Sequence, residues 1–462
     1  MSINNYTIPT IYKGIRLLLL IFLLSVCRSM PMELLPKLIL PELQTKVANK
    51  MIKNVIDYIP NEYFLLYTLH HGKMVWYATF NHDGTNIVTT SRDNTAKIWN
   101  AEDGQLFHTL DHDNFVRSAA FNREGTIIVT TSDDKTAKIW NVQDGQLFHT
   151  LDHNNWVWSV AFNSGGTRIV TDDDDAKIWN VQDGQLLRTL HHGNLVHYVA
   201  FNPNGTKIVT TSDDNTAKIW NAENGQLLHT LNHGDSVWSA AFNHDGTNIV
   251  TVSNDNTVKI WNAESGQLIH TLQDPAIQEN TTHSSLVWSA VFNHDGTRIV
   301  TASADNTAKI WNAEDGQLLH TLNHGDSVRS ATFNPEGTRI VTASDDDTAK
   351  IWNAEDGQLL HMLNHDDWVS YATFNHDGTR IVTASADNTA KIWDMERIEE
   401  KAKTLEWFKY NLSVSQAEII NRAYKEKLEG TTFVLEKKDK NVFNQMPAYV
   451  QKFIIEVLDI TF

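Results

Sequence analysis

The sequence predicts an all-β protein in which eight four-stranded blades form a closed ring. A block of short apolar runs cut by turn residues, as in residues 293–322, repeats through the middle of the chain. One tryptophan of this block recurs at spacings of 41, 39, 41, 41, 50, 41 and 41 residues, which is the range expected for propeller blades. These tryptophans are Trp99, Trp140, Trp179, Trp220, Trp261, Trp311, Trp352 and Trp393.

Each copy contains four runs, and Gly, Asn or Asp residues separate them, which is typical of antiparallel hairpins. The eighth copy stops at Asp394, after its third run. The missing fourth run stands ahead of the first copy, in residues 64–69. We therefore expect an N-terminal strand to complete the last blade and close the ring of residues 62–394. Seven blades with a stray hairpin would leave one copy unpaired.

The repeats carry most of the negative charge of the chain. The 462 residues include 56 acidic and 38 basic side chains, and residues 62–394 hold 42 of the acidic and 20 of the basic ones. Such a surface repels phosphate backbones, so we expect no nucleic-acid partner; a cationic protein or peptide fits better. Because most of these acids lie in turns, a merely soluble acidic surface is the alternative.

Residues 1–29 resemble an export signal. Lys13 and Arg16 precede an apolar run, residues 17–26, that is too short to span a bilayer. We therefore expect a periplasmic or secreted protein without a stable transmembrane span. The segment also resembles a bacterial lipoprotein signal, in which Cys27, the one cysteine of the chain, would be lipidated. The alternative is a cytoplasmic chain whose true start is Met30 or Met32.

Residues 30–61 are expected to contain one helix, because Leu43, Val47, Met51, Val55 and Ile59 recur at every fourth position. Residues 35–47 faintly resemble the opening of an F-box, which would imply a ubiquitin-ligase-type substrate adaptor. A helix packed against the propeller is the plainer interpretation.

Four residue types return at fixed offsets in the copies, and in the sixth copy they are His283, Thr301, Asp305 and Trp311. With this pattern, about 72% of the chain resembles the WD-repeat family. The resemblance implies that the four side chains form one hydrogen-bonded set in each blade, as buried polar groups must be paired. The third copy is two residues short, which leaves the position of its aspartate open.

The positions at which the copies differ are the informative ones, because the framework is the same in every blade. Two such positions flank a valine at the start of the innermost strand. The period of a strand places both on the face opposite the valine, at one mouth of the ring. A third position precedes the framework aspartate. The WD-repeat resemblance implies that these positions bind a partner. The candidates are Trp76, Arg117, Trp156, Trp158, His197, Trp238, Trp288, Arg329, Trp368, Asp133, Asp213 and Asp345.

These residue types predict a non-catalytic, monomeric scaffold that binds a protein or peptide. Tryptophan and arginine are common interface hot spots, and tryptophan beside aspartate suits a cationic segment. In the alternative, the bulky side chains merely plug the channel. A third hypothesis is a propeller enzyme with a channel active site, for which His197, Asp133, Asp213 and Asp345 are the candidates.

We expect no cofactor and no metal. No Gly-rich phosphate loop or nucleophile–base pair is present. Histidines at one blade position are spread around the ring, so Zn–N bonds of about 2.0–2.1 Å should not be possible from neighbouring blades.

Residues 395–462 are predicted to form a helical extension. Residues 395–412 form one helix, Ser413 or Ser415 caps a second that ends at Gly430, and residues 443–458 form a third. We expect this extension to pack on the propeller or to bind a partner.

Overall fold

The computed structural model describes residues 61–276, 282–429, 432–458 and 460. Contacts divide the chain into two units, and Asn61–Ile398 forms one of them. The described part of the other begins at Glu399. The expected export signal, the N-terminal helix and the F-box-like stretch lie outside the described residues.

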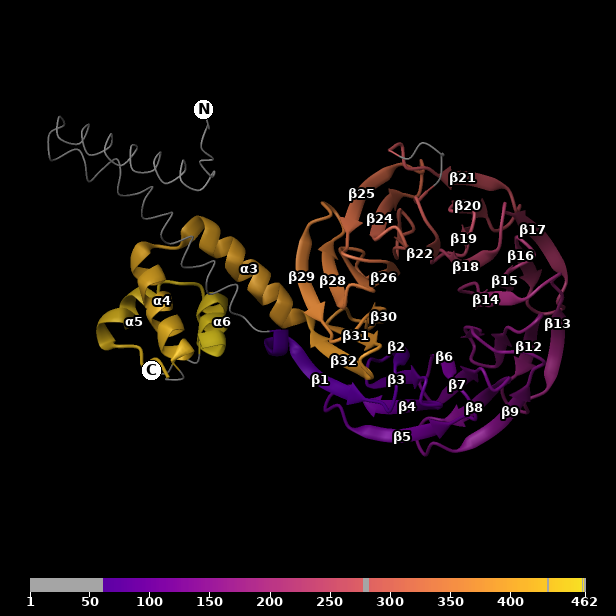
Figure 1. Ribbon diagram of the computed structural model, residues 1–462, viewed down its shortest axis with the longest axis horizontal. Helices are drawn as coiled ribbons and strands as arrows, with labels where there is room; N and C mark the ends of the chain where they lie inside the picture. Colours follow the sequence, from indigo (N-terminus) through magenta and orange to yellow (C-terminus); the bar gives the residue numbers. More distant parts are fainter. Residues whose placement is uncertain (1–60, 277–281, 430–431, 459, 461–462) are drawn as a thin grey trace, which may run out of the picture. The chain divides into compact units, whose positions relative to one another are not determined.

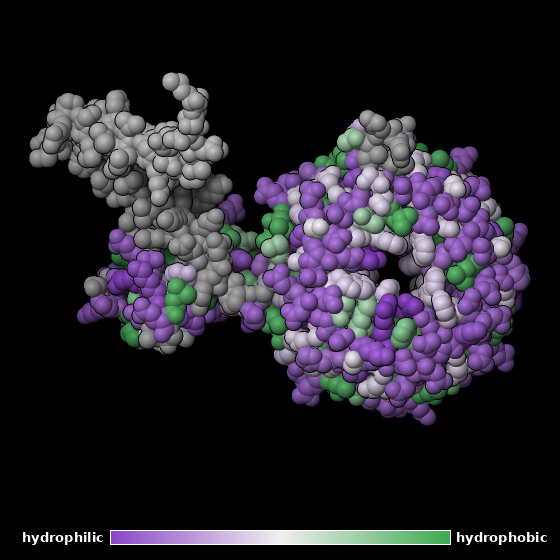
Figure 2. Space-filling view, in the orientation of Figure 1, coloured by the Kyte–Doolittle hydropathy of each residue, from purple (hydrophilic) through white to green (hydrophobic). Residues whose placement is uncertain are grey.

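The first unit is an eight-bladed propeller, as the sequence predicts. Its strands form eight sheets of four, and within each sheet neighbouring strands are antiparallel. Figure 1 shows the first strand of each sheet facing the centre of the ring and the fourth strand at its periphery. The ring leaves a central opening, visible in Figure 2 within a mainly hydrophilic surface.

The innermost strands all begin at the valine identified in the sequence, except in the third blade. They are β2 (Val75–Phe80), β6 (Val116–Phe121), β10 (Val160–Phe162), β14 (Val196–Phe201), β18 (Val237–Phe242), β22 (Val287–Phe292), β26 (Val328–Phe333) and β30 (Val369–Phe374). The second strands are β3 (Asn86–Ser91), β7 (Ile127–Ser132), β11 (Arg168–Thr171), β15 (Lys207–Ser212), β19 (Asn248–Ser253), β23 (Arg298–Ser303), β27 (Arg339–Ser344) and β31 (Arg380–Ser385).

The third strands carry the framework tryptophans. They are β4 (Thr95–Asn100), β8 (Thr136–Asn141), β12 (Ala176–Asn180), β16 (Thr216–Asn221), β20 (Val258–Asn262), β24 (Thr307–Asn312), β28 (Thr348–Asn353) and β32 (Thr389–Asp394). The outermost strands are β5 (Leu106–Asp111), β9 (Leu147–Asp152), β13 (Leu186–Leu190), β17 (Leu227–Asn232), β21 (Leu268–Leu272), β25 (Leu318–Asn323), β29 (Leu359–Asn364) and, after the short 3-10 helix η1 (Asn61–Tyr63), β1 (Leu65–His70).

The ring closes through β1, which pairs antiparallel with β32 as the outer strand of the eighth blade. Leu69 stands opposite Ala390 in this pairing, and its side chain is fully buried. The predicted closure by an N-terminal strand is thereby confirmed. One sheet therefore joins the beginning of the propeller to its end, and the ring has no open blade.

The hydrophobic core lies between neighbouring blades. Val300 and Ile310 of one blade pack with Val328, Ile340 and Trp352 of the next, and all are buried. The turn between the second and third strands places one residue at positive φ in seven blades, as at Asn306 (φ 68°). Asparagine tolerates that conformation better than most residues. In the third blade, which is two residues shorter, no residue other than glycine has a positive φ.

The C-terminal extension is helical, as predicted. Its helices are α3 (Met395–Asn411), α4 (Val414–Leu428), α5 (Lys437–Phe443) and α6 (Ala448–Leu458). Ser413 caps α4 in a capping box with Gln416. The third predicted helix is wrong at its start, because Phe443 ends the separate helix α5. The polar sequence of α5 has no apolar period to predict it. In the described part of the chain, no helix combines the length and apolarity needed to cross a membrane.

Candidate functional site

A hydrogen-bonded chain fixes the loops at one mouth of the ring. In the sixth blade, Asp305 Oδ2 lies 2.8 Å from His283 Nδ1, and His283 Nε2 lies 2.7 Å from Thr301 Oγ1. Trp311 donates its indole N–H to the same hydroxyl over 3.0 Å. One consistent arrangement has the indole donating to Thr301, Thr301 to His283, and His283 to Asp305. The four predicted framework residues therefore lie together and anchor the loop ahead of the innermost strand.

Burial determines the charge state of this framework. It lowers the pKa of His283, although hydrogen bonding to Asp305 opposes the shift. Burial also acts against ionisation of Asp305, but bonds from His283 and Thr307 outweigh it and hold the pKa of Asp305 below its usual value. The same shifts recur in six further blades, at His71, His112, His192, His233, His324 and His365 with their aspartates. A neutral histidine beside an ionised aspartate is therefore the folded state of the framework.

The third blade departs from this arrangement. His153 turns Nδ1 to the carbonyl of Leu151, 2.9 Å away, and Asp173 instead forms an ion pair with Lys177. Asp172 is fully buried, and its Oδ1 accepts the backbone N–H groups of Trp158 and Ser159 over 2.8 and 2.9 Å. Burial raises the pKa of Asp172 well above its usual value, and these two bonds oppose the shift. The Asp172 side chain thus provides hydrogen bonds to residues 158 and 159, which lie ahead of the shortened strand β10.

The variable residue after the valine lies at a β-bulge in seven blades. In the first blade, Val75 pairs with Ser91 and Tyr77 with Thr90, so Trp76 is the extra residue. The expectation from simple alternation along the strand is therefore wrong at this point, because a bulge interrupts the period of two and redirects the side chain. The residue before the valine is bonded to the loop before the framework aspartate, as in Arg92 N–H to Met74 O at 2.9 Å. All three kinds of variable position consequently share one mouth.

Aromatic and charged side chains from neighbouring blades form a belt around this mouth. We define the belt as Trp76, Arg117, Trp158, His197, Trp238, Trp288, Arg329 and Trp368.

On one side of the belt, His197 lies between two indoles. Its ring centroid is 5.3 Å from that of Trp158 and 4.1 Å from that of Trp238, and both pairs are stacked. Its Nε2 lies 2.6 Å from Asp213 Oδ1. Trp238 is followed by Trp288, whose ring meets it edge-on at 6.4 Å.

On the other side, an arginine takes the place of the histidine. The guanidinium of Arg329 lies 5.2 Å from the ring centroid of Trp288 and 5.4 Å from that of Trp368. Its Nε and Nη2 bond to the Asp345 carboxylate over 2.8 and 2.7 Å. Trp368 then meets Trp76 edge-on, with 6.1 Å between the centroids.

Two arginines lie against Trp76. Arg92 and Arg117 are 5.4 and 5.3 Å from its ring centroid, and Arg117 also forms two bonds to Asp133, over 2.8 and 2.6 Å. Every predicted site aspartate thus has a basic partner within its own blade. Arg92, which was not among the predicted site residues, belongs to the same surface, and its Nε is buried without a hydrogen-bond partner among the described residues.

The mouth differs at the third blade, where the first part of the innermost strand is missing. Trp156 is 48% exposed, and its ring lies 6.3 Å from that of Trp158. The indole N–H of Trp158 is buried without a hydrogen-bond partner among the described residues, as is Oδ2 of Asp172. We call Trp156, Trp158 and Asp172 the third-blade notch. Trp156 and Trp158 are among the predicted partner-binding residues, whereas Asp172 is not.

The four residues considered for an enzyme lie on three separate blades. His197 and Asp213 form a pair in the fourth blade, whereas Asp133 and Asp345 bond to arginines of the second and seventh blades. None of the described contacts brings the three carboxylates together around one reacting atom.

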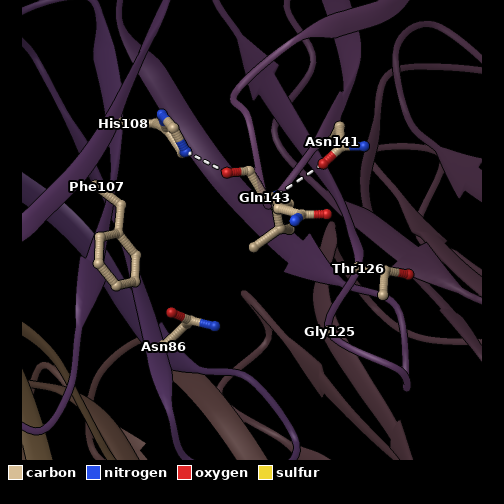
Figure 3. Close-up of a pocket in the computed structure, with 8 residues that line it drawn as sticks. Asn86, Phe107, His108, Gly125, Thr126, Asn141 and Gln143 are labelled. Carbon is tan, nitrogen blue, oxygen red and sulfur yellow. Dashed lines mark hydrogen bonds between the residues drawn. The ribbon is translucent and has the colours of Figure 1, made fainter.

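A cavity of about 760 Å³ lies elsewhere, near the outer strands of the first two blades (Figure 3). Phe107 and Asn86 border it, and His108 Nε2 lies 3.0 Å from the Gln143 carbonyl oxygen. A similar cavity of about 720 Å³ is lined by Phe148 and His149 in the next blade. Because it recurs with the framework, we interpret this hollow as a feature of blade packing.

The fold and its mouth define a β-propeller that presents one variable ring of side chains on a constant framework. The family model described as WD domain, G-beta repeat matches residues 64–100, 104–141, 145–180, 184–221, 225–262, 267–312, 316–353 and 357–394. The chain belongs to the WD40 family. Propellers of this family commonly mediate protein–protein interaction and are typically non-catalytic scaffolds.

A solved structure similar to this chain is that of the computationally designed Ika8 protein. The identity is 27% and the TM-score 0.63, over 72% of this chain and 99% of that chain. No curated protein sequence matched.

Proposed function

We propose that the protein is a non-catalytic scaffold that binds a segment of another protein at the third-blade notch, beside the belt, with Trp156 as its anchor. The exposure of Trp156 carries this proposal. The belt indoles are half-buried against arginine, histidine or each other, whereas Trp156 in the notch is 48% exposed. A large exposed aromatic side chain at the rim of a concave mouth is a common binding hot spot.

We further propose that the bound segment is cationic. The belt indoles already accept guanidinium groups, as in the sandwich of Arg329 between Trp288 and Trp368. Among the described contacts, no guanidinium or ammonium group lies over the ring of Trp156 or Trp158. An arginine or lysine of the partner would supply the missing cation–π contact beside Trp156. The net negative charge of residues 62–394 favours the approach of such a segment.

The plugging alternative makes a different prediction for the same residues. Bonds of Arg117 and Arg329 to aspartates within their blades support a structural role for that part of the belt. The notch, by contrast, leaves a buried indole N–H without a partner, which is costly unless a ligand or water satisfies it. We therefore assign binding of the partner to the notch and a structural role in the propeller to the Arg117–Asp133 and Arg329–Asp345 pairs.

Affinity capture with the full chain tests the proposal. Three forms are compared: the wild type, Trp156→Ala, and the control Leu106→Ala, whose side chain is similarly exposed, at 46%, on the outermost strand β5. We expect mass spectrometry to find a protein that is retained by the wild type and by Leu106→Ala but lost with Trp156→Ala. Equal recovery with all three forms, while unfolding temperatures stay unchanged, would exclude the notch as the binding site.

A further inference from the structure

The opposite mouth of the propeller carries a different group of side chains. There, the turn between the first and second strands of each blade has a histidine in four blades. These are His82, His244, His294 and His376. They occupy the first, fifth, sixth and eighth blades, so they form two pairs on neighbouring blades. The other blades have Arg123, Ser164, Pro203 and Pro335 at this position.

The rings of each pair lie close together. The centroids of His82 and His376 are 4.2 Å apart, and those of His244 and His294 are 4.0 Å apart. The expectation that histidines at one blade position cannot share an ion was drawn from those of the outer strands. There, neighbouring histidines bond to separate carbonyls, whereas these turns meet near the axis of the ring.

The backbone beneath each histidine is held firmly. In the first blade, Asn81 Oδ1 accepts the N–H of Asn86 over 2.9 Å, and Gly84 donates its N–H to the Asn81 carbonyl over 3.1 Å. Asn243, Asn293 and Asn375 make the equivalent side-chain bonds. The four imidazoles are exposed, and no described hydrogen bond engages their ring nitrogens. They are therefore positioned but available.

All four histidines line one cavity of about 580 Å³, together with Phe292, Phe333, Phe374 and Pro335. Proline separates the two pairs along this arc, in the seventh blade.

We propose that each histidine pair binds one Zn²⁺ ion. Imidazole is a preferred ligand of zinc, copper and nickel. At Zn–N distances of about 2.0–2.1 Å, two ligating nitrogens lie roughly 3.3 Å apart, which rotation of these adjacent side chains can provide. No set of three or more His, Cys, Asp or Glu side chains in the described residues is arranged to hold a metal. Each ion therefore has two protein ligands and keeps open positions for water or for a group from a partner.

Most of the other histidines are engaged in hydrogen bonds, which favours binding at the two pairs. The eight that open the copies are bonded to framework threonines, for example His71 to Thr89 over 2.7 Å. Five on the outer strands lie 2.7–3.0 Å from backbone carbonyls. His108 and His149 provide a matched control, because they also occupy equivalent positions on neighbouring blades.

Isothermal titration of the full chain with Zn²⁺ at neutral pH tests this proposal. We expect two ions per chain for the wild type and for the control His108→Ala/His149→Ala. His82→Ala/His376→Ala and His244→Ala/His294→Ala should each retain one ion, and the fourfold variant none. All four substitutions are in exposed turns, so circular dichroism and the unfolding temperature should stay unchanged. No zinc uptake by the wild type, or undiminished uptake by the fourfold variant, would overturn the proposal.

Discussion

At the scale of single residues, the framework threonine is the junction of each blade. Thr301 is fully buried and connects the indole of Trp311 to the imidazole of His283. Because the hydroxyl both accepts and donates, neither ring can keep its bond without it. The loop that presents the belt depends on this one oxygen.

Thr301→Val should lower the free energy of unfolding by about 1–3 kcal/mol, because valine keeps the shape but leaves a buried N–H and a buried ring nitrogen unpaired. Urea titration followed by tryptophan fluorescence measures the loss. The exposed Thr321, on β25, provides the control, and Thr321→Val should stay within about 0.5 kcal/mol of the wild type. Equal effects of the two substitutions would contradict the assigned role.

The framework also predicts how stability depends on pH. Burial lowers the pKa of the framework histidines below 6.5, the ordinary value, so the unfolded chain binds more protons than the folded one in this range. Their contribution is therefore complete above pH 6.5 and is lost as pH falls towards their folded pKa values. The framework aspartates, with lowered pKa values, add a further loss below pH 4. Urea midpoints at pH 8, 6 and 5 should decrease in that order; a midpoint that rises on acidification would contradict the neutral-histidine framework.

At the scale of elements, the third blade shows how a shortened copy is accommodated. Its innermost strand β10 has three residues, whereas the other innermost strands have six. Asp172 takes over two backbone N–H groups that would otherwise be unpaired. This carboxyl supports the backbone of Trp158 and so shapes the notch.

Asp172→Ala should cost about 1–3 kcal/mol of stability because it leaves those N–H groups without an acceptor. Asp172→Asn keeps an acceptor oxygen and removes a group that burial prevents from ionising easily, so its stability at pH 8 should equal or exceed that of the wild type. Chemical denaturation at pH 8 compares the three proteins. If the alanine and asparagine variants behave alike, the bonds to Trp158 and Ser159 do not support the blade.

At the scale of the whole molecule, the pairing of β1 with β32 makes the ring one cooperative unit. Leu69→Ala removes a fully buried side chain from this closure and should lower the free energy of unfolding by about 2–5 kcal/mol. Leu106→Ala, on the exposed outer strand β5, should have a much smaller effect. Comparable losses for both leucines in denaturant titrations would show that closure does not determine stability.

The sequence predicts the framework well because its signals are local and repeated. The turn glycines, the framework tryptophans and the unpaired run of residues 64–69 are each recognised from short-range patterns, and together they predict eight blades and their closure. The belt is less predictable. The bulge at Trp76 and the pairing of Arg117 with Asp133 depend on neighbouring strands, and a copy alone cannot reveal them.

Structure at the departures from the repeat does not follow from the local sequence. Asp172 is the first of four consecutive aspartates, a pattern that favours an exposed turn, yet it is buried. The turn histidines His82 and His376 stand 294 residues apart in the numbering and meet only because the ring closes. Helix α5 has no apolar period at all. In each case, packing between distant segments decides the outcome.

We propose that a partner protein binds at the third-blade notch through Trp156. Titration calorimetry with a partner recovered by the wild-type chain measures this directly, against Trp156→Ala and Leu106→Ala. We expect Kd to rise at least about tenfold, equivalent to about 1.4 kcal/mol, with Trp156→Ala and to stay unchanged with Leu106→Ala. An unchanged Kd for Trp156→Ala, in a protein that unfolds at the wild-type temperature, would contradict the account.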